Sequence, residues 1–273
     1  MSKAAEQPLT DEGLVLRDDA DGVTTLTLNR GAQRNCLSIG LMTALSNALS
    51  EVASEKSVRV VIIAANGPAF CSGHDLKELT SHRADADKGR AFFDTTMRLC
   101  SAIMQQIVNL PKPVIARIHG IATAAGCQLV ASCDLAIAAD GAKFATPGVN
   151  IGLFCSTPMV ALSRNVSRKH AMEMLLTGEM ISAEHAAEIG LINQVVPADT
   201  LDTTTRGLAL KIAEKSALTV KIGKEAFYHQ LEKPLNEAYD YASEVMVTNM
   251  LAHDAEEGIG AFIEKRHPIW EDK

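Results

Sequence analysis

The hydrophobic and polar positions in the first two-thirds of the chain alternate between strand-like and helix-like patterns. Residues 13–17 and 23–28 predict a β-hairpin, because the strong turn dipeptide D-G lies between them. Apolar residues then recur every three or four positions from 41 to 52, which predicts a helix with Ser38 as its N-cap. The chain therefore begins with two paired strands and a helix.

Three apolar runs without alternating polar positions predict strands that are buried on both faces. They cover residues 58–64, 114–118 and 135–138. Between the first two runs, residues 90–110 repeat at helical spacing, and Pro111 ends that pattern. Strands that alternate with helices predict a layered α/β architecture. No strand is followed by G-x-G-x-x-G, which disfavours a dinucleotide-binding fold.

The last third of the chain is predicted to be mainly helical. From about residue 156 onward only residues 192–196 are strand-like. The remaining periodic stretches predict five helices, at residues 182–189, 199–215, 217–230, 234–251 and 254–265. The pattern as a whole predicts a mixed core followed by a helical C-terminal part.

The amino-acid composition argues against several classes of function. Hydrophobic residues make up 47% of the 273 positions and charged residues 22%, so the chain can bury a core and is not a disordered protein. A net charge of −7, with aromatic residues at 4%, disfavours a nucleic-acid partner. No apolar run is long enough for a spanning helix, so a membrane partner is not expected.

The cysteines and the first residues of the chain bear on the compartment. The six cysteines form no C-x-x-C pair and none has a histidine at metal-ligand spacing, so we expect free buried thiols and no metal site. Residues 1–10 show neither the apolar stretch of a signal peptide nor an arginine-rich transit pattern. We therefore expect a cytoplasmic protein, with a processed organellar form as the alternative.

Two segments share one arrangement that suggests chemistry. Residues 60–79 and 113–130 each combine a buried strand, a tight turn of small residues and a helix. Small residues let a ligand approach the backbone, and a helix N-terminus leaves N–H groups unpaired. Two such turns that face each other would supply two convergent N–H donors for a carbonyl that becomes an enolate. The alternative is that these small residues serve packing alone.

Several motifs resemble those of one enzyme family. They are L-N-R-G-A-Q-R-N-C-L (28–37), F-C-S-G-H-D-L-K-E (70–78), P-V-I-A-R-I-H-G-I-A-T-A-A-G-C-Q-L (113–129), C-D-L-A-I-A (133–138), A-E-I-G-L-I-N-Q-V-V (187–196) and A-F-I-E-K-R (261–266). In order and spacing they resemble the crotonase superfamily, the enoyl-CoA hydratase/isomerase group. The resemblance runs from about residue 12 to the C-terminus, and the segment 150–158 resembles one subgroup of that family.

The resemblance implies a fold, a ligand and an assembly. The expected fold is α/β (α+β), a spiral of ββα units, with an acyl-CoA core at 12–200 and a helical trimerisation region at 201–273. The ligand would be an acyl-CoA thioester in fatty or organic acid metabolism, with coenzyme A as part of the substrate and no separate cofactor. The expected partner is a further copy of the chain, as a homotrimer or a dimer of trimers.

The resemblance also assigns site residues. The oxyanion donors would be the backbone N–H groups of His74 and Ala125. Substrate contacts would come from the loop before the first helix, from both turns, from the 150–158 segment and from the C-terminus, where a neighbouring subunit's ligand is within the expected reach. These residues are Arg30, Arg34, Cys36, Ser72, Gly73, Gly126, Cys155, Phe262 and Lys265.

Two departures from the family pattern bear on the reaction. The two glutamates that position and activate water in hydratases of this family correspond to Gln128 and Gly148 here. Neither residue can take a proton, and acid–base groups contribute roughly 10²–10⁴-fold each. We therefore expect weak hydration of crotonyl-CoA, raised at least ~10-fold by glutamate at both positions if position 148 tolerates a side chain.

The missing carboxylates leave three functions open. The leading one is an enzyme of the hydratase/isomerase family, a lyase that stabilises an enolate. The second is another enolate reaction, such as decarboxylation, isomerisation or thioester hydrolysis. The third is a non-catalytic acyl-CoA binding protein. The imidazole of His74 is a candidate replacement acid/base, because histidine titrates near neutral pH.

Overall fold

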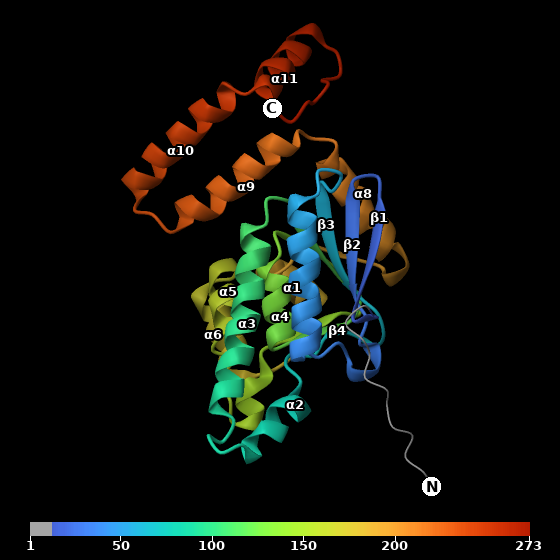
Figure 1. Cartoon of the computed structure of the whole chain (residues 1–273), viewed down its shortest axis with the longest axis vertical. Coiled ribbons are helices and arrows are strands. Elements are labelled where there is room, and N and C mark those ends of the chain that lie inside the picture. The colour runs from blue at the N-terminus through green and yellow to red at the C-terminus, as the bar shows by residue number, and fades with distance from the viewer. Residues whose placement is uncertain (1–12) are drawn as a thin grey trace.

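Two sheets organise the chain in the computed structural model, which describes residues 13–273 (Figure 1). The larger sheet has six strands in the order β1-β2-β3-β5-β7-β10 and the smaller has four in the order β4-β6-β8-β9. The strands of the larger sheet are β1 Val15–Ala20, β2 Val23–Leu28, β3 Val60–Ala65, β5 Val114–Ile118, β7 Leu135–Ala139 and β10 Gln194–Val196. Those of the smaller sheet are β4 Ala69–Cys71, β6 Ile121–Thr123, β8 Lys143–Ala145 and β9 Ile181–Ser182.

Eleven α-helices accompany these strands among the described residues. They are α1 Ile39–Ser54, α2 Leu76–Ser81, α3 Arg90–Asn109, α4 Ala125–Ser132, α5 Pro158–Asn165, α6 Arg168–Thr177, α7 Ala183–Glu188, α8 Leu201–Ala213, α9 Ala217–Leu231, α10 Leu235–Met250 and α11 His253–Glu264. The expected long helix at 90–110 and the five C-terminal helices are all present, with ends that differ from expectation by up to a few residues.

The strands and helices follow a repeat. In each of the pairs β3–β4, β5–β6 and β7–β8, the first strand joins the larger sheet and the second joins the smaller sheet. A helix follows each pair, and α1 follows the hairpin of β1 and β2. The expected spiral of ββα units is therefore confirmed.

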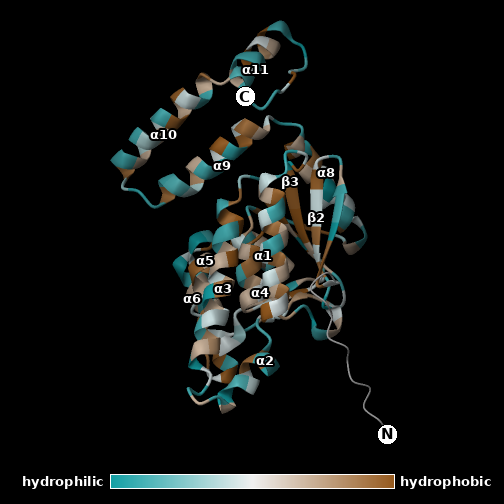
Figure 2. Ribbon diagram, in the orientation of Figure 1, coloured by the Kyte–Doolittle hydropathy of each residue, from teal (hydrophilic) through white to brown (hydrophobic). Residues whose placement is uncertain are grey.

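The core explains why the apolar runs form buried strands. All six residues of β3 are buried, and Figure 2 shows this strand as apolar along its length. Val61 and Ile63 belong to the cluster that α1, α3 and α4 cover, whereas Val60 and Ile62 pack in a second cluster with Ala209 of α8. Because successive side chains point to opposite faces, a strand between two helical layers must be apolar at every position.

The helices α9, α10 and α11 extend away from the sheets (Figure 1). A buried polar contact anchors α9 to the core: Lys224 Nζ lies 2.7 Å from Asp134 Oδ2 and donates to the carbonyl groups of Ile107 and Lys112. The hydroxyl of Tyr228 donates to the other oxygen of Asp134. We refer to residues 217–264 as the C-terminal arm.

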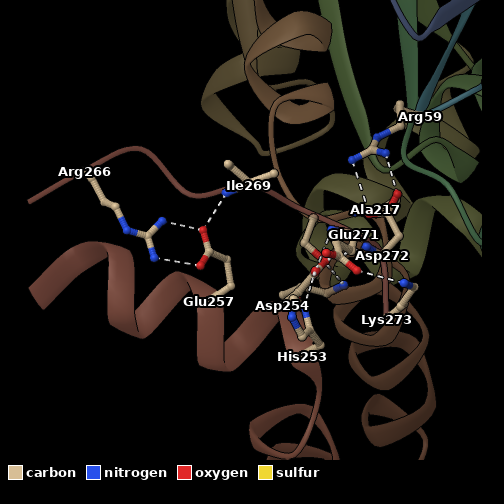
Figure 3. A network of polar contacts seen from close by, with 12 residues as sticks. Arg59, Ala217, His253, Asp254, Glu257, Arg266, Ile269, Glu271, Asp272 and Lys273 are labelled. Atoms are coloured by element: carbon tan, nitrogen blue, oxygen red, sulfur yellow. Dashed lines mark hydrogen bonds and ion pairs between the residues drawn. The ribbon is translucent and has the colours of Figure 1, made fainter. Parts of the chain in front are cut away.

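The last residues of the chain tie this arm back to the core (Figure 3). The carboxylate of buried Asp254 accepts hydrogen bonds from the backbone N–H groups of Glu271 and Asp272. Asp272 in turn pairs with Arg59 at 2.7 Å and accepts from the N–H of Ala217. The C-terminal tail therefore connects α11, the start of α9 and the segment before β3.

Two features of the expected organisation need comment. The small sheet was not predicted, because strands of two or three residues carry no periodicity. The predicted division at 12–200 and 201–273 stays a prediction; its first residue lies outside the described residues, and α8 packs against the large sheet rather than with the arm. No helix among residues 13–273 is long and apolar enough to cross a membrane.

Candidate functional site

The two strand–turn–helix segments meet in the structure. Gly73, on the turn after β4, has φ +92°, and a Cβ placed there would lie 2.9 Å from the Cβ of Ala124 on the turn after β6. A Cβ on Gly126 would lie 2.1 Å from the carbonyl oxygen of Cys71. Only glycine permits this approach at either position, so the small residues of the two motifs bring the turns together.

The backbone N–H of His74 is free to meet a ligand. Leu37 forms a parallel bridge with His74, in which the N–H of Leu37 donates to Gly73 at 2.7 Å and its carbonyl accepts from Asp75 at 3.1 Å. In such a bridge the central residue's own N–H points away from its partner strand. This N–H has no hydrogen-bond partner among the described residues.

The backbone N–H of Ala125 is a second donor without a partner in the part of the chain that the structure describes. Ala125 is the first residue of α4, and the first intrahelical bond of that helix is made by Gln128, whose N–H donates to Ala124. The N-cap Ala124 has φ 52° and ψ −118°, a backbone region that costs a non-glycine residue about 1–3 kcal/mol. This strained turn holds the Ala125 N–H beside the Gly73 turn.

Two of the N–H groups at the start of the helix α2 are already bonded. The side chain of Asp75 caps this helix by accepting from the N–H groups of Lys77 and Glu78. Arg30 pairs with the other oxygen of Asp75 at 2.8 Å and also donates to Cys36, to both its carbonyl oxygen and its sulfur. The guanidinium of Arg30 is thus part of the wall of the site, and any CoA contact would come in addition to these bonds.

Two further predicted contact residues lie next to this network. The exposed Arg34 accepts a hydrogen bond at its carbonyl from the N–H of Ser72, which joins the loop before α1 to the turn after β4. The contacts between the loop before α1 and the turn after β4 therefore bring Arg30, Arg34, Cys36, Ser72 and Gly73 together. Whether they contact CoA stays a prediction.

Gln128 and Gly148 are both buried in the first turns that follow β6 and β8. Gln128 lies on α4, and its Oε1 is 3.9 Å from the sulfur of Cys100 on α3. Gly148 lies in the short 3-10 helix Pro147–Ile151. The N–H of Ala124 donates to Ala145, so the segments that carry these two positions are hydrogen-bonded neighbours.

The space beside Gly148 is filled by the segment that follows it. The N–H of Gly148 donates to Cys155 Sγ at 3.3 Å, and Leu153 donates to the Gly148 carbonyl at 2.9 Å. A Cβ at position 148 would lie 2.7 Å from the Leu153 carbonyl oxygen and 2.9 Å from Cys155 Sγ. The sequence does not reveal this contact, because it depends on how residues 148–155 turn back on themselves.

Phe262 and Lys265 are not brought to the two donors within one chain. Both belong to the end of α11, where Phe262 is 85% exposed and Lys265 is the left-handed C-cap. Figure 1 shows α11 and α2 at opposite ends of the molecule. A role in ligand binding would require a neighbouring copy of the chain.

Burial keeps three thiols and the imidazole of His74 near the donors in their neutral forms, whereas Arg30 and Asp75 form an ion pair. Burial raises the pKa of Cys155, and it raises the pKa of Cys71 and Cys100 to about 12, so these thiols stay protonated at neutral pH. Burial lowers the pKa of His74, so its imidazole is uncharged there. Among residues 13–273 no group of three or more acidic, histidine or cysteine side chains is arranged to hold a metal ion.

This arrangement can polarise a carbonyl group. The two N–H groups lie on turns that are in van der Waals contact, and a ligand oxygen that accepts from both would be stabilised as it gains negative charge. The nearest carboxylate, that of Asp75, is paired with Arg30. The geometry suits acyl compounds that pass through an enolate or an oxyanion.

Curated relatives share this sequence over most of its length. The chain is 50% identical over 250 residues to mouse enoyl-CoA hydratase domain-containing protein 3, mitochondrial, covering 92% of this chain and 82% of the relative. It is 48% identical to the human protein of that name, over 92% of this chain and 81% of the relative. These are relatives of the subgroup that the segment 150–158 resembles.

The names of these relatives overturn one expectation. Five proteins that are 44–50% identical over more than 90% of this chain are named as mitochondrial. The expected cytoplasmic location is therefore wrong. It rested on the composition of residues 1–10, which lie outside the described residues.

Solved structures and a family match agree with the geometry. A crystal structure of human enoyl Coenzyme A hydratase domain-containing protein 3 superposes with a TM-score of 0.90 at 47% identity, over 94% of this chain and all of that chain. An enoyl-CoA hydratase from Mycobacterium smegmatis superposes with a TM-score of 0.89 at 50% identity, over 94% and 98%. Residues 18–273 match the family described as enoyl-CoA hydratase/isomerase. With its repeated ββα units, its crotonase fold and its two meeting turns, this chain belongs to the enoyl-CoA hydratase/isomerase family.

Proposed function

We propose that the protein binds an acyl-CoA thioester in mitochondria and stabilises its enolate with the backbone N–H groups of His74 and Ala125. Family membership supports the ligand class, and the relatives' mitochondrial names support the compartment. The observation that carries the proposal is the contact between the Gly73 and Ala124 turns, which leaves these two N–H groups free and adjacent. A thioester oxygen that accepts from both would gain negative charge at low reorganisation cost.

Calorimetry with a matched pair of ligands tests this proposal. Butyryl-CoA is compared with its thioether analogue, in which a methylene replaces the carbonyl group. Each hydrogen bond contributes about 0.5–1.5 kcal/mol, so we expect the thioether to bind about 10-fold more weakly. Equal affinities would contradict the role of the two N–H groups, and no binding of either ligand at millimolar concentration would contradict the ligand class.

The reaction that we propose is an enolate reaction other than efficient hydration. Gln128 cannot transfer a proton, and the space beside Gly148 is occupied by Leu153 and Cys155. The absence of a water-activating pair disfavours the addition of water to a double bond, and isomerisation, decarboxylation or thioester hydrolysis are the candidate reactions. A non-catalytic acyl-CoA binding protein is the second candidate, favoured by the same observation.

A panel of thioesters separates the enzyme from the binding protein. Crotonyl-CoA, a malonyl-type CoA and butyryl-CoA are each incubated with the protein, and loss of substrate is followed by mass spectrometry. Turnover of one compound well above that of crotonyl-CoA supports the enzyme. Tight binding of all three without turnover supports the binding protein.

The arm supports self-association as a homotrimer or a dimer of trimers. Its surface carries large apolar side chains that are more than half exposed, and a soluble chain rarely leaves so many uncovered. They are Phe227, Leu231, Leu235, Tyr239, Met246, Val247, Met250, Leu251, Phe262 and Ile263. In such an assembly Phe262 and Lys265 would meet a neighbour's ligand. Sedimentation should give about three or six times the 29.2 kDa of one chain, and a stable monomer would contradict this assembly.

A further inference from the structure

The imidazole of His74 is an unsatisfied polar group. Both ring nitrogens are buried, and neither has a hydrogen-bond partner among residues 13–273. The carbonyl of Leu37 lies near the ring and favours its charged form, but no ring nitrogen reaches it with hydrogen-bonding geometry. A buried polar group without a hydrogen bond lowers the stability of the fold. Such a group therefore marks a place where a ligand or substrate supplies the missing hydrogen bond.

The same residue carries one of the two free N–H donors. A thioester oxygen that accepts from the His74 N–H has the neighbouring Cα of the acyl group within the length of one histidine side chain. Because ring and N–H belong to one residue, the imidazole lies within one side-chain length of the oxygen that this N–H would hold. Among residues 13–273, Thr146 Oγ1 near Gly148 is also buried without a partner, but a hydroxyl oxygen is a much weaker base than an imidazole that titrates near neutral pH.

The nearby carboxylates are already occupied. Asp75 caps α2 and pairs with Arg30, and Glu78 accepts from the N–H of Ile39 at the start of α1. The two positions that the family resemblance assigns to glutamates are Gln128 and Gly148 in this chain. A proton at Cα would therefore have to be taken by a different kind of group.

The protonation state of His74 suits that task. Burial lowers its pKa from 6.5, the Leu37 carbonyl opposes this, and no charged side chain contributes to the shift. The loop before α1, β4, α2 and α4 carry the titratable groups Arg30, Arg34, Cys36, Cys71, Asp75, Lys77, Glu78 and Cys127, and α3 adds Cys100 together with Arg90, Asp94 and Arg98. The thiols of Cys71, Cys100 and Cys127 are held protonated, because burial raises their pKa to about 12. A neutral imidazole is then the base that neutral pH leaves available.

We propose that the imidazole of His74 takes the α-proton of the bound acyl-CoA and returns a proton to the same carbon. The inference rests on the proposed function. The unprotonated ring nitrogen accepts the proton from Cα, and the C–H electron pair becomes the double bond between Cα and the carbonyl carbon. The carbonyl π electrons move to the oxygen, which the N–H groups of His74 and Ala125 hold. Return of the proton from the imidazolium restores the thioester, so the step needs no further reactant.

Exchange of α-hydrogens tests this role without knowledge of the physiological substrate. The full-length protein is incubated with butyryl-CoA in D₂O, and deuterium at Cα is measured by mass spectrometry. His74→Gln keeps the backbone N–H and removes the base. We expect it to slow exchange at least ~100-fold while butyryl-CoA affinity changes less than about threefold. His82→Gln is the matched control, because His82 lies outside the site and pairs with Asp85, and it should exchange at the wild-type rate.

The pH profile of the wild-type protein is the second measurement, and it does not depend on a variant that folds. Exchange should rise with pH below 6.5 and be level from about pH 7 upward, because the base is the neutral form of a group whose pKa burial lowers. Wild-type protein that binds butyryl-CoA but exchanges no deuterium would overturn the inference and leave the binding proposal intact. Exchange that survives in both His74→Gln and His74→Asn would overturn it too. Absence of binding would instead show that the proposed function itself fails.

Discussion

The sulfur of Cys155 lies 3.3 Å from the backbone nitrogen of Gly148, inside the space that a side chain at position 148 would need. This contact bears on the proposed reaction, because the family resemblance assigns one of the two water-activating glutamates to position 148. The backbone of Gly148 does not have a positive φ, so conformation alone would permit a side chain. Crowding forbids it instead, since the Leu153 carbonyl oxygen would lie 2.7 Å from the new Cβ.

Replacement of Gly148 by alanine should therefore destabilise the protein. We expect the free energy of unfolding to fall by about 1–3 kcal/mol, the usual effect of overpacking a buried site, as measured by urea denaturation. Gly141→Ala is the control, because a Cβ there meets no atom within 4 Å. Equal stability of the two variants would mean that the 148–155 segment yields easily and that the site is more open than its contacts indicate.

The same contact changes the expected outcome of restoring carboxylates. Glutamate at both 128 and 148 was expected to raise hydration only if position 148 accepts a side chain, and that condition is not met. Gln128→Glu alone should raise crotonyl-CoA hydration by less than 10-fold, because one carboxylate leaves the water half-positioned. Gln105→Glu, at an exposed position of α3, is the control for added charge. Turnover above about 1 per second in Gln128→Glu would contradict this account.

The close approach of the two turns predicts a specific loss of binding. Gly73→Ala places a Cβ 2.9 Å from Ala124 and should separate the turns, so we expect butyryl-CoA affinity to fall at least ~10-fold. Gly152→Ala is the matched control, because its φ of +76° imposes a similar backbone penalty while its Cβ meets no atom within 4 Å. Calorimetry on both variants separates crowding from backbone strain. Similar losses in both would indicate general destabilisation.

The C-terminal tail predicts an acid-sensitive contact. Hydrogen bonds from Arg266 and from the N–H of Ile269 lower the pKa of Glu257 from 4.5 to about 2 (Figure 3). A lowered pKa means that the contact stabilises the fold above about pH 4.5 and is lost as the pH falls towards 2. Trp270, the single tryptophan of the chain, bonds to the Glu214 carbonyl and reports on the tail.

Tryptophan fluorescence measures this effect. Between pH 5 and pH 2 the wild-type protein should release Trp270 progressively. Glu257→Gln should already show the loosened tail at pH 6 and change less on acidification, because it lacks the titrating group. Glu256→Gln, at an exposed neighbouring position, should behave like the wild type. An acid transition that is unchanged in Glu257→Gln would contradict the assignment.

The sequence by itself determined the elements whose environment is uniform along their length. The run of apolar residues in β3 has one physical meaning, because only a strand between two helical layers tolerates an apolar side chain on both faces. The long helix α3 and the arm helices were predictable because their apolar residues recur at helical spacing along the whole element. The small residues of the two turns, with the family motifs around them, also identified the N–H groups of His74 and Ala125 as candidate donors.

Only the tertiary structure decided what surrounds those donors. The short strands β4, β6 and β8 have too few residues for a periodic pattern, and they pair only because the repeat brings them side by side. The strain at Ala124 and the unsatisfied ring of His74 are set by neighbours distant in sequence. The occupation of the Gly148 space by Cys155 depends on how residues 148–155 turn back on themselves. Contacts of this kind join residues that are distant in sequence, and their energy depends on both partners. They therefore leave no local pattern in the sequence.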